Sequence, residues 1–256
     1  MESIIARLKN PEYFDLSRWS LRSPSLSTDA QALNSCLILL YGAAGTGKTY
    51  SAGVIANELG RDLIKIEASQ LRDKYYGETE KRVKELFEAI RHANQKPKTA
   101  PVFLLNEADL ILHKRSDTRL SNVASTENAI QNIFLEELEK LPGILILTTN
   151  LMNNMDEALF RRLHFKLEFK LPDASAASRL WRLHLVKEIP GAAEIDCEYL
   201  GHEYCLSGGL IRIIVQNACY HAMQRGKNAK LLLEDIERYA ELEALGKHNL
   251  ERKVGF

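Results

Sequence analysis

A glycine-rich segment between an apolar run and a helical pattern constrains the fold of this 256-residue chain more than any other feature. The segment Gly42-Ala43-Ala44-Gly45-Thr46-Gly47-Lys48-Thr49 follows apolar residues 37–41 and precedes a helical pattern over residues 50–59. It matches the spacing GxxxxGK[ST], which has structural meaning when a strand comes before it and a helix after it. The strand–loop–helix order predicts an α/β fold.

The residue types in this segment are suited to holding the phosphate groups of ATP. Glycines let the backbone bend so that several N–H groups point inward, and the following helix adds the positive end of its dipole. Lys48 is expected to reach the β- and γ-phosphates, and the Thr49 hydroxyl to ligate Mg²⁺. The predicted nucleotide contacts are Gly42, Ala43, Ala44, Gly45, Thr46, Gly47, Lys48, Thr49 and Tyr50.

Short apolar runs alternate with helical patterns through the first two thirds of the chain. Strands are predicted at residues 37–41, 63–66, 102–105, 144–148 and 165–169, and the first four are apolar enough to be covered on both faces. Strand signals stop after Pro172, while helical spacing continues, with a charged helix predicted at 232–245. We expect a lead-in segment at 1–35 with one short helix, a large α/β subdomain at 36–172 and a helical subdomain at 173–256.

Charge and hydropathy limit the partners and the location. Lys plus Arg and Asp plus Glu each number 34, so the net charge is zero, which argues against nucleic acid as the partner. No apolar stretch approaches the roughly 18 residues of a membrane span, and the N-terminus lacks the hydrophobic segment of a secretory signal. We expect a cytoplasmic protein with no membrane segment. Because only about 35 residues precede the first strand, we also expect either a fragment or a dependence on adaptors.

Polar residues follow the apolar strand 102–105. Glu107 lies where a phosphate-loop ATPase places the general base that activates water, and Asn106 lies where the Mg²⁺-associated Asp is usual. The Asn106 amide can hydrogen-bond a metal-bound water but adds no charge. Mg²⁺ affinity is therefore expected to be weaker, unless Asp109 or a shell water compensates. The alternative is that Asn106 and Glu107 form a helix N-cap pair.

Taken in order, these motifs resemble those of the AAA ATPases over residues 36–220. Residues 71–81 resemble the stretch that lines the central pore of a hexamer and grips a threaded polypeptide, through the residues Tyr75, Tyr76 and Gly77. Residues 147–150 resemble the sensor-1 strand, whose Asn, here Asn150, helps position the attacking water. The Asn-Glu-Ala-Asp variant at 106–109 and, more loosely, residues 126–132 are similar to a bacterial AAA subgroup.

Residues 155–166 resemble the segment of katanin, spastin and the ESCRT-disassembly ATPases that ends in a pair of arginine fingers, here Arg161 and Arg162. In the family these project toward the γ-phosphate bound by the next subunit. The alternative is a pair of surface arginines in salt bridges. Gly209, at the start of a lid helix, is expected to approach the adenine. Arg212 resembles the sensor-2 position but fits an ordinary exposed arginine equally well.

The resemblance implies a parallel sheet with strand order 5-1-4-3-2, flanked by helices and followed by a helical lid. It implies ATP and Mg²⁺ as cofactors and a ring-type homo-oligomer, hexameric when ATP-bound, which remodels or translocates a protein or peptide substrate. One alternative is a slow or inactive nucleotide-dependent assembly module, because of Asn106. A phosphate-loop kinase would not need Asn150 with an arginine pair. A DNA-acting loader should show a basic stripe, and none stands out.

Overall fold

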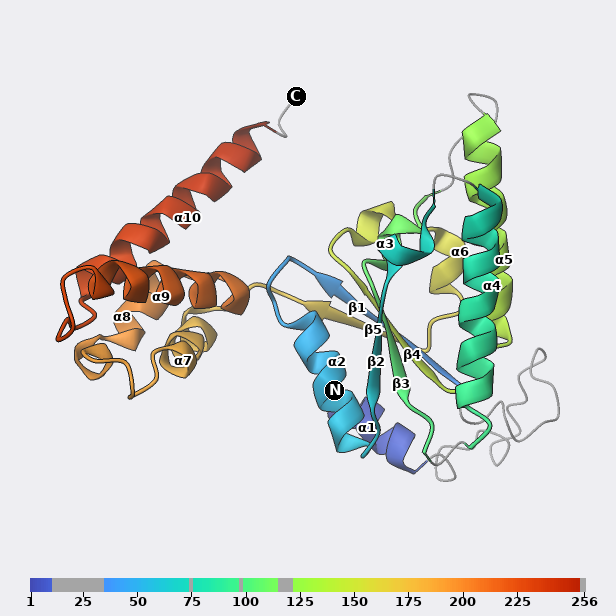
Figure 1. Cartoon of the computed structure of the whole chain (residues 1–256), viewed down its shortest axis with the longest axis horizontal. Helices are drawn as coiled ribbons and strands as arrows, with labels where there is room; N and C mark the ends of the chain where they lie inside the picture. Colours follow the sequence, from blue (N-terminus) through green and yellow to red (C-terminus); the bar gives the residue numbers. More distant parts are fainter. Residues whose placement is uncertain (11–34, 74–75, 97–98, 115–121, 254–256) are drawn as a thin grey trace. The chain divides into compact units, whose positions relative to one another are not determined.

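A computed structural model of the chain describes residues 1–10, 35–73, 76–96, 99–114 and 122–253 (Figure 1). The chain forms two compact units, of which the first comprises residues 1–42 and 48–169. The second comprises residues 43–47 together with the chain from residue 170 onward. The chain therefore passes from the first unit to the second after Phe169, and five residues of the glycine-rich segment belong with the second.

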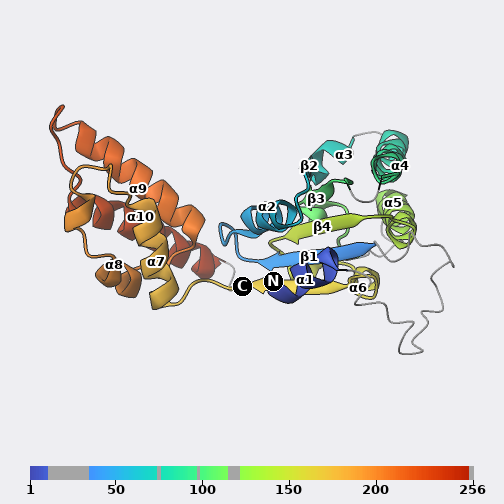
Figure 2. The ribbon, with the colours of Figure 1, turned by 90° about the horizontal axis from the view of Figure 1, so that it is seen from below.

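The first unit is built on a parallel sheet, which has five strands among the described residues. The order is β2-β3-β4-β1-β5, and Figure 2 shows the strands in this sequence. This confirms the expected order 5-1-4-3-2. The strands are β1 (Cys36–Gly42), β2 (Leu63–Glu67), β3 (Val102–Asn106), β4 (Ile144–Thr149) and β5 (Phe165–Phe169). Four of them extend one residue or more beyond the predicted ranges, and the added C-terminal residues Gly42, Glu67, Asn106 and Thr149 are less apolar than the strands they complete.

Helices cover both faces of the sheet because side chains alternate along each strand. Leu37 and Leu39 of β1 lie in a core with α4 (Tyr76–Ala93) and α5 (Asn122–Glu139). Ile38 and Leu40 lie in the opposite core with α1 (Glu2–Lys9) and α2 (Lys48–Glu58). Figure 1 shows α2 on one side of the sheet and the pair α4 and α5 on the other. Within that pair, the rings of Phe87 and Phe134 meet edge to face, with centroids 5.0 Å apart.

Strand β2 departs from the expectation that the first four strands are covered on both faces. It forms the edge of the sheet, and both Ile64 and Lys65 are exposed. The expectation holds for β3 and for β4, whose six residues are all buried. For β2 the expectation is wrong, because β2 lies at the edge of the sheet. Lys65, within the short run Leu63–Ile66, places a charged side chain on this edge strand, where charge is favourable.

Short helical segments complete the first unit. They are α3 (Ala68–Leu71) and α6 (Glu157–Phe160), with the 3-10 helices η4 (Ala108–Leu110) and η5 (Met152–Asn154). Helix α1 confirms the predicted short helix in the lead-in segment. Helix α2 begins at Lys48 rather than at residue 50, so Lys48 and Thr49 form its first turn.

The second unit contains only helices among its described elements, as predicted. These are α7 (Ala174–His184), η6 (Ala192–Glu194), α8 (Cys197–Glu203), α9 (Gly208–Met223) and α10 (Leu233–Lys253). Trp181 is fully buried in their shared core. The carboxylates of Asp173 and Asp196 accept backbone hydrogen bonds at the starts of α7 and α8. Helix α10 runs eight residues beyond the predicted range. Within the described residues, no helix combines the length and apolar character needed to cross a bilayer.

Candidate functional site

Polar residues meet where the parallel strands end. In a parallel sheet the carboxyl ends lie on one edge, and ligands of open α/β sheets bind outside that edge. Glu67 at the end of β2 is the register partner of Asn106 at the end of β3. Thr149 at the end of β4 is the partner of Tyr41 in β1, one residue before the glycine-rich loop. Asn106 and the start of the glycine-rich loop, which come from separate motifs, therefore lie along the same edge of the sheet.

Gly42 shows why the loop requires glycine. Its φ is 137°, and a Cβ at this position would lie 2.1 Å from the carbonyl oxygen of Phe169. Gly45 and Gly47 also have positive φ, so the chain turns sharply between β1 and α2. Lys48 is buried, and its Nζ donates to the Gly42 carbonyl oxygen at 2.8 Å. Burial lowers the pKa of Lys48, and the charge of Asp109 acts in the opposite direction.

Asn106 lies at the centre of a hydrogen-bonded set. Its Oδ1 accepts from the hydroxyl of Thr148 at 2.7 Å and from that of Thr49 at 3.3 Å. Its Nδ2 donates to Oε1 of Glu67 at 3.4 Å. The amide therefore joins β2, β3, β4 and the first turn of α2. Thr49 and Asn106, the two predicted Mg²⁺ contacts, are in direct contact with one another.

Glu107 has a left-handed backbone, with φ 55° and ψ 47°. No other non-glycine residue among those described has a positive φ. Its N–H donates to the hydroxyl of Thr148 at 3.3 Å, and its side chain is exposed. The residue precedes η4 but makes no side-chain capping hydrogen bond, so the N-cap alternative finds no support at this position. Strained backbone of this kind is concentrated at functional sites.

The structure distinguishes the two arginines of the predicted finger pair. Arg162 is held within its own chain: Nη1 donates to the Ala158 carbonyl oxygen at 2.8 Å, and Nη2 lies 2.6 Å from a Glu139 carboxylate oxygen. Arg161 is exposed and makes no ion pair with any residue that the structure describes. Asn150 directly follows β4 and is exposed. The structure therefore holds the Arg162 side chain in place and leaves the Arg161 side chain exposed.

In the second unit, the loop residues pack against the start of α9. The N–H of Gly209 donates to the Gly45 carbonyl oxygen at 2.9 Å, and a Cβ on Gly209 would lie 2.9 Å from the Gly45 Cα. The close approach permitted by Gly209 is therefore to the loop. Ser207 is buried beside Gly45, and its Oγ has no hydrogen-bond partner among the described residues. Arg212 is exposed, and the pKa of His184 is lowered by burial and then by the Arg212 charge.

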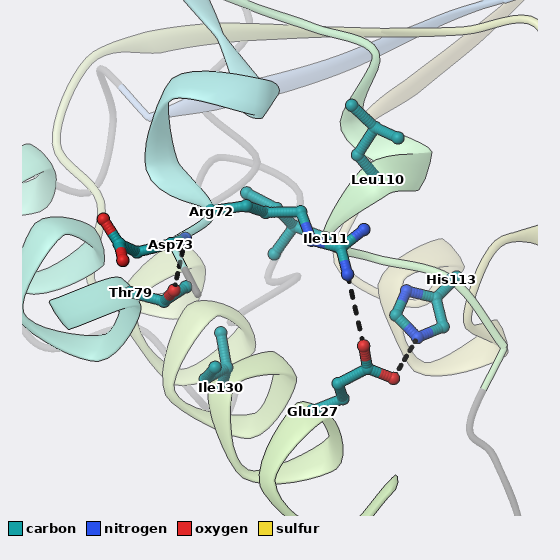
Figure 3. A pocket seen from close by; sticks show the side chains of 8 residues that line it. All are labelled: Arg72, Asp73, Thr79, Leu110, Ile111, His113, Glu127 and Ile130. Atoms are coloured by element: carbon teal, nitrogen blue, oxygen red, sulfur yellow. Dashed lines mark hydrogen bonds and ion pairs between the residues drawn. The ribbon is translucent and has the colours of Figure 1, made fainter. Parts of the chain in front are cut away.

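The predicted pore segment is described only in part. Tyr75 lies outside the described residues, Tyr76 is described only as the first residue of α4, and Gly77 is exposed in that helix. Beside this segment is a cavity of about 170 Å³ (Figure 3). Arg72 and His113 both face Glu127 there, with nitrogen–oxygen distances of 3.2 and 3.6 Å. Glu127 of α5 thus contacts both Arg72, which follows α3, and His113, which follows η4, on one wall of the cavity.

The residues present fit ATP with Mg²⁺. Hydroxyl and amide oxygens, here of Thr49 and Asn106, are the hard donors that Mg²⁺ accepts alongside phosphate oxygens. The buried cation of Lys48, the first turn of α2 and the positive-φ glycines are suited to an anionic phosphate chain.

The sequence motifs did not identify Thr148 and Glu67 as site residues. Thr148 holds both Asn106 and the backbone of Glu107, and Glu67 contacts the Asn106 amide. Each is a polar residue at the carboxyl end of an apolar strand, which is the signal that would have indicated them.

Comparison with known proteins agrees with the motif order. The family described as "ATPase family associated with various cellular activities (AAA)" matches residues 38–171. A probable 26S proteasome regulatory subunit 4 of Caenorhabditis elegans is 28% identical over 250 residues, covering 94% of this chain and 51% of that protein. Vacuolar protein sorting-associated protein 4B of Mus musculus is 31% identical over 89% of this chain and 48% of its own length. A proteasome-activating nucleotidase of Saccharolobus solfataricus is 31% identical over 84% of this chain and 53% of its own. The chain thus spans about half the length of these curated relatives.

Proposed function

The chain belongs to the AAA family of ATPases, and we propose that it binds ATP with Mg²⁺ and hydrolyses it at the carboxyl edge of the sheet. One observation carries the proposal. Thr49, Asn106, Thr148 and the backbone of Glu107 form a single hydrogen-bonded set next to the phosphate loop. The set brings together the two residues that we assign to Mg²⁺ and the backbone of the residue that we assign as the base.

Each residue has a role in this proposal. Residues 42–50 hold the nucleotide, with Lys48 directed to the phosphates, and Thr49 and Asn106 hold Mg²⁺, which neutralises phosphate charge when bound. Glu107 takes a proton from the attacking water, and Asn150 helps orient that water. Thr148 is a positioning residue, because its hydroxyl contacts both Asn106 and the Glu107 backbone.

We further propose that residues 36–172 act as the ATP-binding subdomain and residues 173–256 as a lid carrying Gly209 and Arg212. Arg161 completes the site of the next subunit, and the exposure of Arg161 without an ion pair among the described residues supports this assignment. The assembly is a ring-type homo-oligomer, hexameric with ATP.

The proposed substrate is a protein or peptide, gripped by Tyr75, Tyr76 and Gly77. The names of the relatives concern proteasome regulation and vacuolar protein sorting, so an ATPase acting in protein handling is the part we carry over. The balanced charge counts against nucleic acid, and the cytoplasm is the proposed location.

The test compares Arg161→Ala with Arg179→Ala, which removes another exposed arginine, from α7. Turnover of the parent chain should rise with protein concentration as sites become shared. Arg161→Ala should lower turnover by roughly 10³-fold while leaving the binding of a fluorescent ATP analogue unchanged. Arg179→Ala should match the parent. Turnover that is independent of concentration and unaffected by Arg161→Ala would refute the shared site.

A second candidate function is a nucleotide-dependent assembly module with little turnover. The observation in its favour is the neutral Asn106 in place of a charged residue. It predicts that ATP drives assembly, measured by light scattering, while phosphate release by the parent chain stays at background at every protein concentration.

A further inference from the structure

We infer that Glu67 supplies the carboxylate charge that Asn106 lacks. Two residues on neighbouring strands then provide the Mg²⁺ site with what a single Asp usually provides. The inference rests on the proposed binding of ATP with Mg²⁺ and extends it to a residue outside every motif discussed above. It assigns the oxygen donor to Asn106 on β3, and the negative charge to Glu67 on β2.

Strand register places the two residues side by side. Glu67 and Asn106 are the last residues of adjacent parallel strands and are direct register partners. Neighbouring strands lie about 4.8 Å apart, so paired side chains on one edge are within contact distance. Oε1 of Glu67 accepts from Nδ2 of Asn106 at 3.4 Å. The Glu67 carboxylate is therefore in direct contact with the side chain of Asn106, the predicted Mg²⁺ contact.

Glu67 also decides which way the Asn106 amide faces. The hydroxyls of Thr49 and Thr148 can donate or accept, so they do not distinguish the amide oxygen from the amide nitrogen. An ionised carboxylate only accepts. The Asn106 NH₂ group must therefore face Glu67, which leaves Oδ1, the atom able to contact a cation or its water, facing Thr49.

The Glu67 carboxylate is not used elsewhere in the described structure. The residue occupies the N-cap position of α3 but makes no side-chain capping hydrogen bond. It forms no ion pair with a described residue, and its side chain is only partly exposed. A half-buried carboxylate without a cation beside the predicted metal contact is a place where a cation would be stabilised.

The experiment moves the charge between the two strands. The Mg²⁺ concentration needed for tight binding of a fluorescent, non-hydrolysable ATP analogue is measured for the parent and for Glu67→Gln, which is isosteric. Manganese binding, followed by electron paramagnetic resonance, gives a second readout. Glu67→Gln should raise the Mg²⁺ requirement by roughly 10-fold or more, while analogue binding in EDTA stays unchanged. Adding Asn106→Asp to Glu67→Gln should restore the parent requirement. Glu88→Gln, an exposed carboxylate on α4, is the matched control.

The outcomes separate this inference from the function on which it rests. A parent chain that binds no ATP analogue would overturn both. A parent that binds it, with an unchanged Mg²⁺ requirement in Glu67→Gln, would overturn the role of Glu67 alone. Failure of Asn106→Asp to restore the requirement would overturn the division of charge between the strands. Analogue binding in EDTA reports that each variant is folded.

Discussion

Replacing Glu107 with glycine should stabilise the chain and abolish hydrolysis together. Glu107 has φ 55° and ψ 47°, a left-handed conformation that glycine adopts without steric cost. The glutamate side chain is exposed, so its removal loses no buried packing. If this residue is the general base, the backbone strain at position 107 is tolerated because the carboxylate is needed there.

The expected gain follows from two opposing terms. A non-glycine residue in the left-handed region costs about 1–2 kcal/mol. Glycine loses about 0.5–1 kcal/mol relative to other residues through the greater freedom of the unfolded chain. The midpoints of these two ranges give a net stabilisation of about 0.75 kcal/mol for Glu107→Gly. For a chain of this size that corresponds to a rise in melting temperature of roughly 1–4 °C.

Glu107→Gln is the matched variant, because it keeps the strained backbone and the length of the side chain but removes the charge. It should melt like the parent, fail to hydrolyse ATP and accumulate as ATP-bound oligomers. Thermal melting and phosphate release are measured on all three chains. A Glu107→Gly chain that is no more stable than Glu107→Gln would show that the backbone at position 107 is not strained. The assignment of the base is refuted if Glu107→Gln hydrolyses ATP like the parent.

Two further predictions concern pH. His164 Nδ1 accepts from the Leu37 N–H at 3.0 Å, and its pKa lies below the ordinary 6.5 because of burial and then the charge of Arg7. On acidification, His164 takes up its proton at a higher pH in the unfolded chain than in the folded chain. The free energy of unfolding should therefore fall as pH drops below about 6.5. His164→Gln, which keeps an acceptor, should flatten that dependence in denaturant titrations, and an unchanged slope would contradict the assignment. In the second unit, paired hydrogen bonds from Arg225 hold the pKa of Asp235 well below its usual range. This stabilisation is present above the ordinary carboxyl pKa and lost as pH falls through the depressed one. Asp235→Asn should lower the free energy of unfolding by about 2–3 kcal/mol at neutral pH, allowing for the partial exposure of Arg225. If the variant melts at the same temperature as the parent, the Arg225–Asp235 pair does not stabilise the fold.

Local patterns predicted most of the fold because each strand carries its own signal. The apolar runs located the five strands, and the resemblance supplied their order. The edge position of β2 was missed because a run of four residues, Leu63–Ile66, does not show whether it is covered on one face or two. The end of α10 was also missed, since its last eight residues are largely polar and carry little apolar periodicity.

The candidate site was predicted where its residues are close in sequence. Lys48 and Thr49 follow from one loop, and Asn106 and Glu107 from one strand end. The roles of Thr148 and Glu67 depend on contacts between strands, which require the register as well as the motif. The distinction between Arg161 and Arg162 also depends on a distant residue, because Glu139 holds only the second.

The charge at the sheet edge is a property of several strands together, and this changes what Asn106 implies. Taken strand by strand, a neutral amide at this position indicates a weaker Mg²⁺ site and favours an assembly module. Taken across the register, Asn106 and Glu67 together carry one oxygen donor and one negative charge, as a single Asp would. If Glu67 provides that charge, the neutral Asn106 no longer supports the second candidate function, a nucleotide-dependent assembly module. The Mg²⁺ requirement of Glu67→Gln therefore bears on whether this chain hydrolyses ATP or only binds it.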